Sequence, residues 1–232
     1  MRIGFDMDGV LADFSTAYYA VEDRLFGAEQ HPRRADDPEN QRTDETPKDA
    51  TSADARPSQA GLKNHRRRSD TVWHAIRNTP DFWLSLGPTD PGAVHRIHEL
   101  MLQYRWEVFF ITQRPATLGE TVQRQTQRWL VNQGFDMPSV LVVPASRGAA
   151  AGALSLDYLV DDSPKNCIDV KSDSTAKPIL IVDGEDKETT GSAGRLGIAT
   201  AGSIAQALDI LAEASTKQPG LLGRLAQLAG LR

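Results

Sequence analysis

The chain has 232 residues, a formal net charge of −5 and a single cysteine, Cys167. This length holds one substantial domain, or a core with a small insert, and the weakly acidic balance gives no electrostatic case for nucleic-acid binding. One cysteine excludes an intrachain disulfide, and because no signal pattern and no run of about 18 apolar residues occurs, we expect a cytoplasmic protein without a membrane partner.

The N-terminal segment is a short apolar run that ends in two carboxylates. Residues 3–5 are typical of a buried strand, and Asp6 and Asp8 follow directly before Gly9. In an open α/β sheet, ligands bind at the carboxyl ends of the strands, where two acids repel each other and lose water. The pattern therefore predicts a divalent cation, Mg²⁺, beside a carboxylate that can act as a nucleophile. A strand followed by an Asp-Gly turn with solvated acids is the competing interpretation.

A polar insert separates this strand from the next one. A helical pattern continues to Phe26, after which residues 28–70 are mainly charged, small polar and proline residues. Such a stretch cannot bury enough apolar surface to offset its ordering entropy, so we expect it to be disordered. The basic triplet at 66–68 could bind phosphate, although a solvated run of charge is the favoured interpretation. A short helix is expected over 71–76, and the ordered chain continues through 82–84.

The rest of the chain alternates apolar strands with amphipathic helices. This alternation predicts a parallel sheet covered by helices on both faces, in a three-layer α/β sandwich with a Rossmann-like sheet. Ser203 is the expected N-cap of the last helix, and Gly134 the expected stop of the middle one. The expected strands are 108–111, 140–143, 158–160 and 179–182, and the expected helices are 91–104, 117–132 and 203–214.

Two more of the predicted strands end in polar side chains. The strand 108–111 runs into Thr112, whose hydroxyl, with free backbone N–H groups, could hold a phosphoryl oxygen. The strand 158–160 runs into Asp161 and Asp162, which point to different sides, so that one can reach a metal while the other fixes a neighbour. A strand cap before a proline turn and an acidic turn are the competing interpretations. Because a hard cation needs several oxygen ligands, the acids at the two strand ends strengthen each other as a metal site.

The segment 6–14, Asp-Met-Asp-Gly-Val-Leu-Ala-Asp-Phe, resembles motif I of the haloacid dehalogenase-like (HAD) phosphohydrolases, and within them most the 5'(3')-deoxyribonucleotidase group. The resemblance implies that Asp6 is the nucleophile and that Asp8 is the general acid/base. Residues 109–115 resemble motif II of the same family, which implies that Thr112 is the phosphate-binding hydroxyl.

The segment 156–164 resembles motif IV of the family, the motif that carries metal ligands. Whether Asp161 or Asp162 binds the metal directly stays open. Asn166 could hold an acid by hydrogen bonding or lie exposed at the start of a helix. In this family the main-chain carbonyl of the second motif I acid also binds Mg²⁺. The resemblance therefore implies metal ligands among Asp6, Asp8, Asp161 and Asp162.

The family also needs a cation between motifs II and IV, which is normally a lysine that offsets charge on the nucleophile and the phosphoryl group. No lysine occurs between Thr112 and Asp161. The best-placed cation is Arg147, which keeps the charge and can bind two phosphate oxygens but is not equivalent to lysine. Arg114 and Lys165 are poorer candidates. This departure leaves open a slower enzyme or a non-catalytic relative.

Residues 81–88 resemble the return from the cap to the core in deoxyribonucleotidases, where aromatic residues of the cap contact the base. Trp73 and Phe82 could stack on a nucleobase or form the small core of the cap, and the two interpretations have equal weight. Trp83 is expected to be structural. The other residues expected at the substrate are Gln113 and Arg114, in the segment that resembles motif II.

The expected organisation is a HAD-like catalytic core over 1–14 and 88–214, a helical cap over 15–87 and an amphipathic tail over 215–232. The leucine stripe of the tail could pack on the chain's own core or form a homodimer contact. We expect a Mg²⁺-dependent phosphomonoester hydrolase that forms an aspartyl-phosphate, and the resemblance implies a (deoxy)nucleoside monophosphate as substrate. Another small phosphoester, such as a sugar phosphate, and a weakened relative that binds phosphorylated ligands stay open as alternatives.

Overall fold

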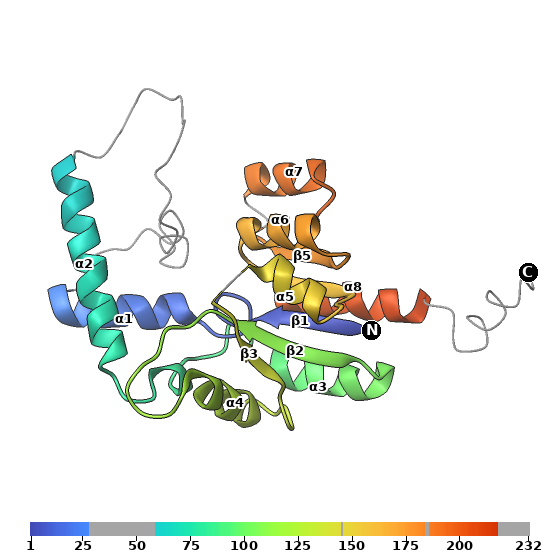
Figure 1. Cartoon of the computed structure of the whole chain (residues 1–232), viewed down its shortest axis with the longest axis horizontal. Helices are drawn as coiled ribbons and strands as arrows, with labels where there is room; N and C mark the ends of the chain where they lie inside the picture. The colour runs from blue at the N-terminus through green and yellow to red at the C-terminus, as the bar shows by residue number, and fades with distance from the viewer. Residues whose placement is uncertain (28–58, 145, 184–185, 218–232) are drawn as a thin grey trace, which may run out of the picture.

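A parallel β-sheet lies at the centre of the chain (Figure 1). The computed structural model describes residues 1–27, 59–144, 146–183 and 186–217. Within these ranges the sheet has six strands in the order β3-β2-β1-β4-β5-β6. The strands are β1 (Arg2–Asp6), β2 (Glu107–Thr112), β3 (Val140–Val142), β4 (Tyr158–Asp161), β5 (Lys177–Ile181) and β6 (Ala199–Ala201).

The pairing register brings the carboxyl ends of the middle strands together. Strand β1 lies between β2 and β4, and its last residue, Asp6, pairs with Ile111, one residue before Thr112. On the other side, the residue before Asp6 pairs with Val160, one residue before Asp161. The three polar residues that the sequence places at strand ends therefore meet at one edge of the sheet.

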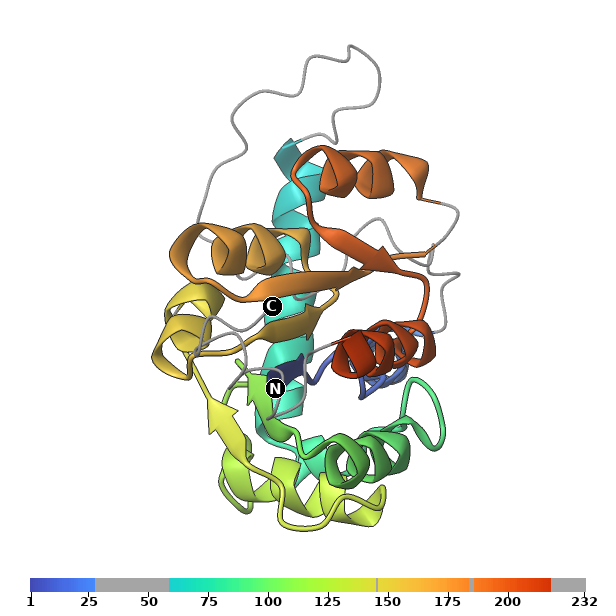
Figure 2. The same cartoon turned by 90° about the vertical axis from the view of Figure 1, so that its right-hand side faces the viewer.

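Helices cover both faces of the sheet, α3, α4 and α8 on one face and α5, α6 and α7 on the other (Figures 1 and 2). The largest apolar core lies under the first group and includes Ile3, Phe5 and Trp129, while smaller clusters under the second group include Leu159 and Leu180. The predicted three-layer α/β class is confirmed. The helices are α3 (Ala93–Tyr104), α4 (Val122–Asn132), α5 (Arg147–Ala153), α6 (Pro164–Asp173), α7 (Lys187–Arg195) and α8 (Ile204–Lys217).

Helices α1 (Phe14–Phe26) and α2 (Gln59–Arg77) lie beyond the carboxyl ends of the strands (Figure 1). The short 3₁₀ helix η2 (Phe82–Leu84) leads from them back to the core. Aromatic rings pack where these elements meet. The ring of Phe14 stacks on Trp73 with centroids 5.4 Å apart, and the ring of Tyr18 packs edge-on against Phe14 at 5.8 Å. These rings belong to the same continuous apolar core as Ile3 and Phe5, so the connection between β1 and β2 packs onto the main core.

Helix α2 begins earlier than the sequence pattern indicated. Residues 59–70 are helical, although disorder was expected over 28–70, and residues 28–58 lie outside the described ranges. Packing on α1 explains part of the difference, because Arg68 lies over the ring of Phe26 at 4.7 Å and forms an ion pair with Glu22 at 3.3 Å. Of the predicted tail over 215–232, the described part belongs to the end of α8, and 218–232 lie outside the described ranges.

Two further differences concern the helices of the core. Helix α4 begins at Val122 instead of 117, because Gly119 adopts a positive φ of 95° and Thr121 caps the helix by accepting a hydrogen bond from the backbone N–H of Arg124. Strand β6 and helices α5 and α7 were not predicted, since their short, small or polar sequences carry little apolar periodicity. Within the described ranges, no helix combines the length and the apolarity that crossing a membrane requires.

Candidate active site

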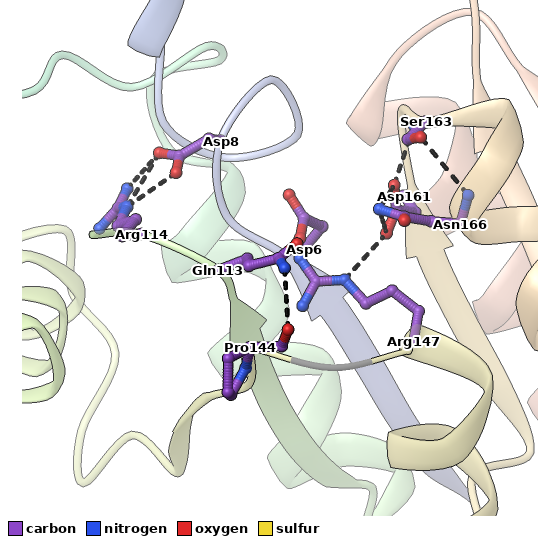
Figure 3. Close-up of polar contacts among 9 residues, drawn as sticks. All are labelled: Asp6, Asp8, Gln113, Arg114, Pro144, Arg147, Asp161, Ser163 and Asn166. Carbon is purple, nitrogen blue, oxygen red and sulfur yellow. Dashed lines mark hydrogen bonds and ion pairs between the residues drawn. The ribbon is translucent and has the colours of Figure 1, made fainter. Parts of the chain in front are cut away.

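Two buried acids face each other across the end of the sheet (Figure 3). Asp6 ends β1 and is 4% exposed, and Asp161 ends β4 and is fully buried. Thr112, at the end of the neighbouring β2, is 1% exposed. Strand geometry explains this burial, because the residues continue apolar strands whose faces are covered by helices.

Arg147 joins the two acids. Its Nη2 donates to Asp6 Oδ1, and its Nε lies 3.5 Å from Asp161 Oδ2, so one guanidinium serves both carboxylates (Figure 3). Arg147 is the first residue of α5, and its side chain is buried. The cation expected between motifs II and IV therefore lies against the predicted nucleophile.

The partners of Asp161 come from the start of α6. Its Oδ1 accepts from the backbone N–H of Ser163 at 2.9 Å, and the side-chain amide of Asn166 lies 3.1 Å from both of its carboxylate oxygens. Of the two roles left open for Asn166, the structure thus shows the hydrogen bond to an acid. Burial raises the pKa of Asp161, while Arg147 and these hydrogen bonds act in the opposite direction.

The pKa of Asp6 is raised well above its usual value, mainly by burial. Arg147 opposes this shift most strongly, because its positive charge favours the carboxylate, whereas Asp161 and Asp8 add negative charge and raise the pKa further. Arg114 lowers the pKa again. The positive charge of Arg147 therefore favours the ionised form of both Asp6 and Asp161.

Asp8 has a cation of its own. The Nε of Arg114 lies 2.9 Å from both carboxylate oxygens of Asp8, and Nη2 donates to Oδ1 at 2.6 Å. Figure 3 shows this pair on the side of Asp6 away from Asp161. Both side chains of the pair are almost fully buried, at 0% and 3% exposure.

Arg114 is itself fixed by the core. Its Nη1 donates to Thr126 Oγ1 in α4 at 2.9 Å, and its guanidinium lies 4.9 Å from the centre of the Trp83 ring. The backbone N–H of Trp83 donates to Gln125 Oε1 at 3.0 Å, and its indole N–H donates to the carbonyl of Pro115 at 2.9 Å. Sequence reasoning missed this network, because only the fold brings η2, α4 and the loop after β2 together.

The loop after β1 makes room for the fourth acid. Gly9 has a φ of 81°, and a Cβ atom added to it would lie 1.9 Å from Asp162 Oδ2. The carboxylate of Asp162 therefore rests against this loop, in the space that the missing side chain leaves. Its neighbour Asp161 turns toward Arg147, so the two adjacent acids point to different sides, as their order in the strand predicts.

The similarity of this chain to known proteins is found in its structure and not in its sequence. No family model matches the chain, and no curated protein matches it in sequence. Among solved structures, it is similar to a candidate β-phosphoglucomutase from Thermotoga maritima, with 18% identity over 91% of this chain and 98% of that chain and a TM-score of 0.51. It is also similar to a hydrolase from Pseudomonas syringae, with 13% identity, coverage of 92% and 99%, and a TM-score of 0.50. The chain has the HAD-type α/β fold.

A third similar structure is a D,D-heptose 1.7-bisphosphate phosphatase from B. bronchiseptica complexed with magnesium and phosphate. It is 14% identical, and the match covers 92% of this chain and 98% of that chain with a TM-score of 0.49.

Within this HAD-type fold, the predicted metal ligands converge in part. Among the described residues, no group of three or more aspartate, glutamate, histidine or cysteine side chains is placed so that it could bind a metal ion. Asp6 and Asp161 both contact the guanidinium of Arg147, while Asp8 pairs with Arg114 and Asp162 rests against the motif I loop. Two buried carboxylates that converge on one positive charge fit the oxygen ligands that Mg²⁺ prefers.

The residues expected at the substrate lie in different surroundings. Phe82 and Trp73 are mostly buried in the aromatic cluster, where the ring of Phe14 packs against both. Trp73 thus stacks on the ring of Phe14, whereas Phe82 meets that ring edge-on. Gln113 is exposed, and its Nε2 donates to the carbonyl of Pro144 at 3.1 Å.

Proposed function

We propose that this protein is a Mg²⁺-dependent phosphomonoester hydrolase that forms an aspartyl-phosphate on Asp6. The observation that carries the proposal is the shared guanidinium: two buried acids from separate strands, Asp6 and Asp161, meet one arginine at the ligand-binding edge of a HAD-type sheet. Such a concentration of buried charge costs stability, and it is typical of active sites.

The reaction has two displacement steps. In the first, an oxygen of Asp6 forms a bond to phosphorus as the bond to the leaving oxygen breaks. Asp8, which has to leave its ion pair with Arg114 and be protonated to act as an acid, gives its proton to that oxygen. In the second, Asp8 takes a proton from water, the water oxygen bonds to phosphorus, and the bond to Asp6 breaks, which releases phosphate. The first step needs Asp6 as an ionised carboxylate, and the second step releases Asp6 in that form, which the charge of Arg147 favours.

Arg147 is proposed to bind phosphoryl oxygens with the hydroxyl of Thr112. An arginine keeps its charge at any working pH and presents a planar set of donors that can bind two oxygens at once. Because negative charge spreads over the phosphoryl oxygens in the transition state, cations fixed around them lower the barrier.

Asp6 and Asp161 are the side chains that would hold Mg²⁺. The ion, when bound, supplies positive charge against the phosphoryl oxygens and the leaving group. Asn166 keeps Asp161 at the edge of the sheet by donating to its carboxylate. Asp162 is placed at the same edge, against the motif I loop.

The proposed substrate is a (deoxy)nucleoside monophosphate. Support comes from the resemblance of segments 6–14 and 81–88 to the deoxyribonucleotidases. The aromatic cluster around Phe14 offers rings on the insert beyond the strand ends, and a base would have to separate Trp73 or Phe82 from its neighbours to stack on it. A sugar phosphate or another small phosphoester is the alternative substrate.

A second candidate function follows from the ion pairs themselves. Asp6 is engaged by Arg147 and Asp8 by Arg114, so both predicted reacting carboxylates are bound to arginines. A relative that binds a phosphorylated ligand without turnover would keep these pairs. It would show Mg²⁺-dependent ligand binding without release of phosphate.

Phosphate release across a panel of nucleoside monophosphates and sugar phosphates, with and without Mg²⁺, tests the proposal. Wild type is expected to release phosphate only with the metal, and Asp6→Asn is expected to be inactive. Asp209→Asn is the matched control, because Asp209 forms a surface ion pair with Arg96 in α3 and the same acid-to-amide change should leave the rate unaltered. Turnover that survives Asp6→Asn would contradict the mechanism.

A further inference from the structure

A single carboxylate fastens the start of helix α5 to helix α6. Asp169 Oδ2 accepts a hydrogen bond from Ser146 Oγ at 2.6 Å and another from the backbone N–H of Gly148 at 3.1 Å. Ser146 and Gly148 are the two residues on either side of Arg147. Asp169 therefore holds the backbone both before and after the arginine that contacts Asp6.

The two helices also approach each other very closely at this point. A Cβ atom added to Gly148 would lie 2.3 Å from the carbonyl oxygen of Asp169 and 2.7 Å from the Cβ of Asp173. Any side chain at position 148 would therefore force the backbone to move. Ser146 completes the attachment, because its Oγ also accepts from the N–H of Ala149 and so caps α5. The start of α5 is thus fixed by a hydrogen-bonded contact to α6.

Helix α6 fixes the other partner of Arg147 as well. Asn166 lies three residues before Asp169 on the same helix, where side chains at this spacing share a face. Its amide holds Asp161, and Asp161 lies 3.5 Å from Arg147. One helix therefore sets the position of the arginine and of the acid beside it.

We propose that Asp169 is a positioning residue for the reaction at this site, because it holds the Arg147 guanidinium in place against Asp6 and the phosphoryl group. The proposal rests on the proposed role of Arg147 in binding that group. A long side chain that ends in a planar donor set can bind two oxygens only if its backbone is fixed, so a small movement of α5 displaces the charge. Asp169 does not touch the reacting atoms and acts through Arg147.

The simpler explanation is that Asp169 only joins α5 to α6 and has no effect on Arg147. A double-mutant cycle distinguishes this structural role from the proposed positioning role. The variants are Asp169→Asn and Arg147→Ala, alone and together. An amide retains the shape of Asp169 but removes its negative charge, which weakens both hydrogen bonds that Oδ2 accepts from Ser146 and Gly148. Asp173→Asn is the matched control on the same helix, because Asp173 approaches Gly148 through its Cβ, which this substitution leaves unchanged.

We expect Asp169→Asn to lower kcat/KM about tenfold in the wild-type background and less than about twofold when Arg147 is alanine, because coupled residues are not additive. The loss of thermal stability should be the same in both backgrounds. Equal losses of kcat/KM in the two backgrounds would mean that Asp169 is only structural. If Asp169→Asn does not fold, Ser146→Ala, which removes one of the two contacts to Asp169, is expected to show the same dependence on Arg147 with a smaller loss.

The same cycle can be measured without turnover. The Kd for inorganic phosphate, from calorimetry, should rise about tenfold in Asp169→Asn and should be unaffected by that change once Arg147 is alanine. If wild type hydrolyses phosphoesters or binds phosphate but the effects of the two substitutions simply add, only the role of Asp169 is overturned. Wild type that does neither overturns both this role and the proposed function.

Discussion

Replacing Arg114 by methionine should destabilise the protein far more than an ordinary surface change. The substitution removes hydrogen bonds of 2.6 to 2.9 Å to Asp8, one bond of 2.9 Å to Thr126 and the contact with the Trp83 ring. Because the Asp8 side chain is only 3% exposed, water cannot replace the lost partner. Removing one member of a buried ion pair costs about 3–5 kcal/mol, since the other charge stays buried without compensation.

For a chain of this size, that cost corresponds to a fall in Tm of about 6–20 °C, at roughly 2–4 °C per kcal/mol. Urea denaturation followed by tryptophan fluorescence measures the change directly. Adding Asp8→Asn to Arg114→Met should recover a large part of the loss, because the second change removes the unpaired charge. Recovery by a second substitution distinguishes a buried charge from lost packing.

The matched control is Arg96→Met, at an ion pair of similar length on the surface. Arg96 lies 2.5 Å from Asp209, but the two side chains are 38% and 68% exposed, so the loss should stay below about 1 kcal/mol. If Arg114→Met lowers the stability no more than this control does, or if adding Asp8→Asn recovers none of the lost stability, then Asp8 and Arg114 do not form the buried charge pair described here.

Three further predictions concern the site and its surroundings. Gly9→Ala should abolish activity, because φ is 81° there and the new methyl would meet Asp162 at 1.9 Å. Gly27→Ala, where φ is 88° but no atom of the described residues lies within 4 Å, should cost about 1–3 kcal/mol of stability and leave activity intact. Burial raises the pKa of Asp6, so the folded protein binds its proton more tightly than the unfolded chain does. The stability of wild type relative to Asp6→Asn should therefore fall as the pH rises above the usual aspartate value of 3.8 and through the raised pKa; a difference that grows in favour of wild type with rising pH would contradict this sign. Cys167 is fully buried and its pKa is raised by burial, so a thiol reagent should label it only in urea, and fast labelling of the native protein would show that α6 is not packed as described.

The positions of the predicted site residues followed from the sequence because they depend on local pattern and sheet geometry. Asp6, Thr112 and Asp161 each continue an apolar strand, and parallel strands end at the same edge. Arg147 was predicted because the family resemblance implies a cation in this part of the chain and no lysine occurs between Thr112 and Asp161. Its contact with Asp6 spans 141 residues of chain and needed the fold.

The parts that were not predicted depend on packing between distant segments. Nothing near Arg114 in the sequence shows that it pairs with Asp8, because Thr126 and Trp83 fix its direction only after α4 and η2 have packed. Helix α5 is short and built mostly of small residues, so it carries little apolar periodicity, and its close contact with α6 at Gly148 appears only in the fold. The aromatic rings of the insert fit either a packed core or a stacking surface, and composition alone could not separate these interpretations.

Trapping of the covalent intermediate tests the central claim most directly. The protein is mixed with Mg²⁺ and a substrate from the panel, quenched in acid within the first turnover, and digested for mass spectrometry. The account predicts a phosphoryl group on the peptide that carries Asp6 and on no other peptide, with none in Asp6→Asn. Phosphate release without this modification, or a phosphoryl group on another residue, would contradict it.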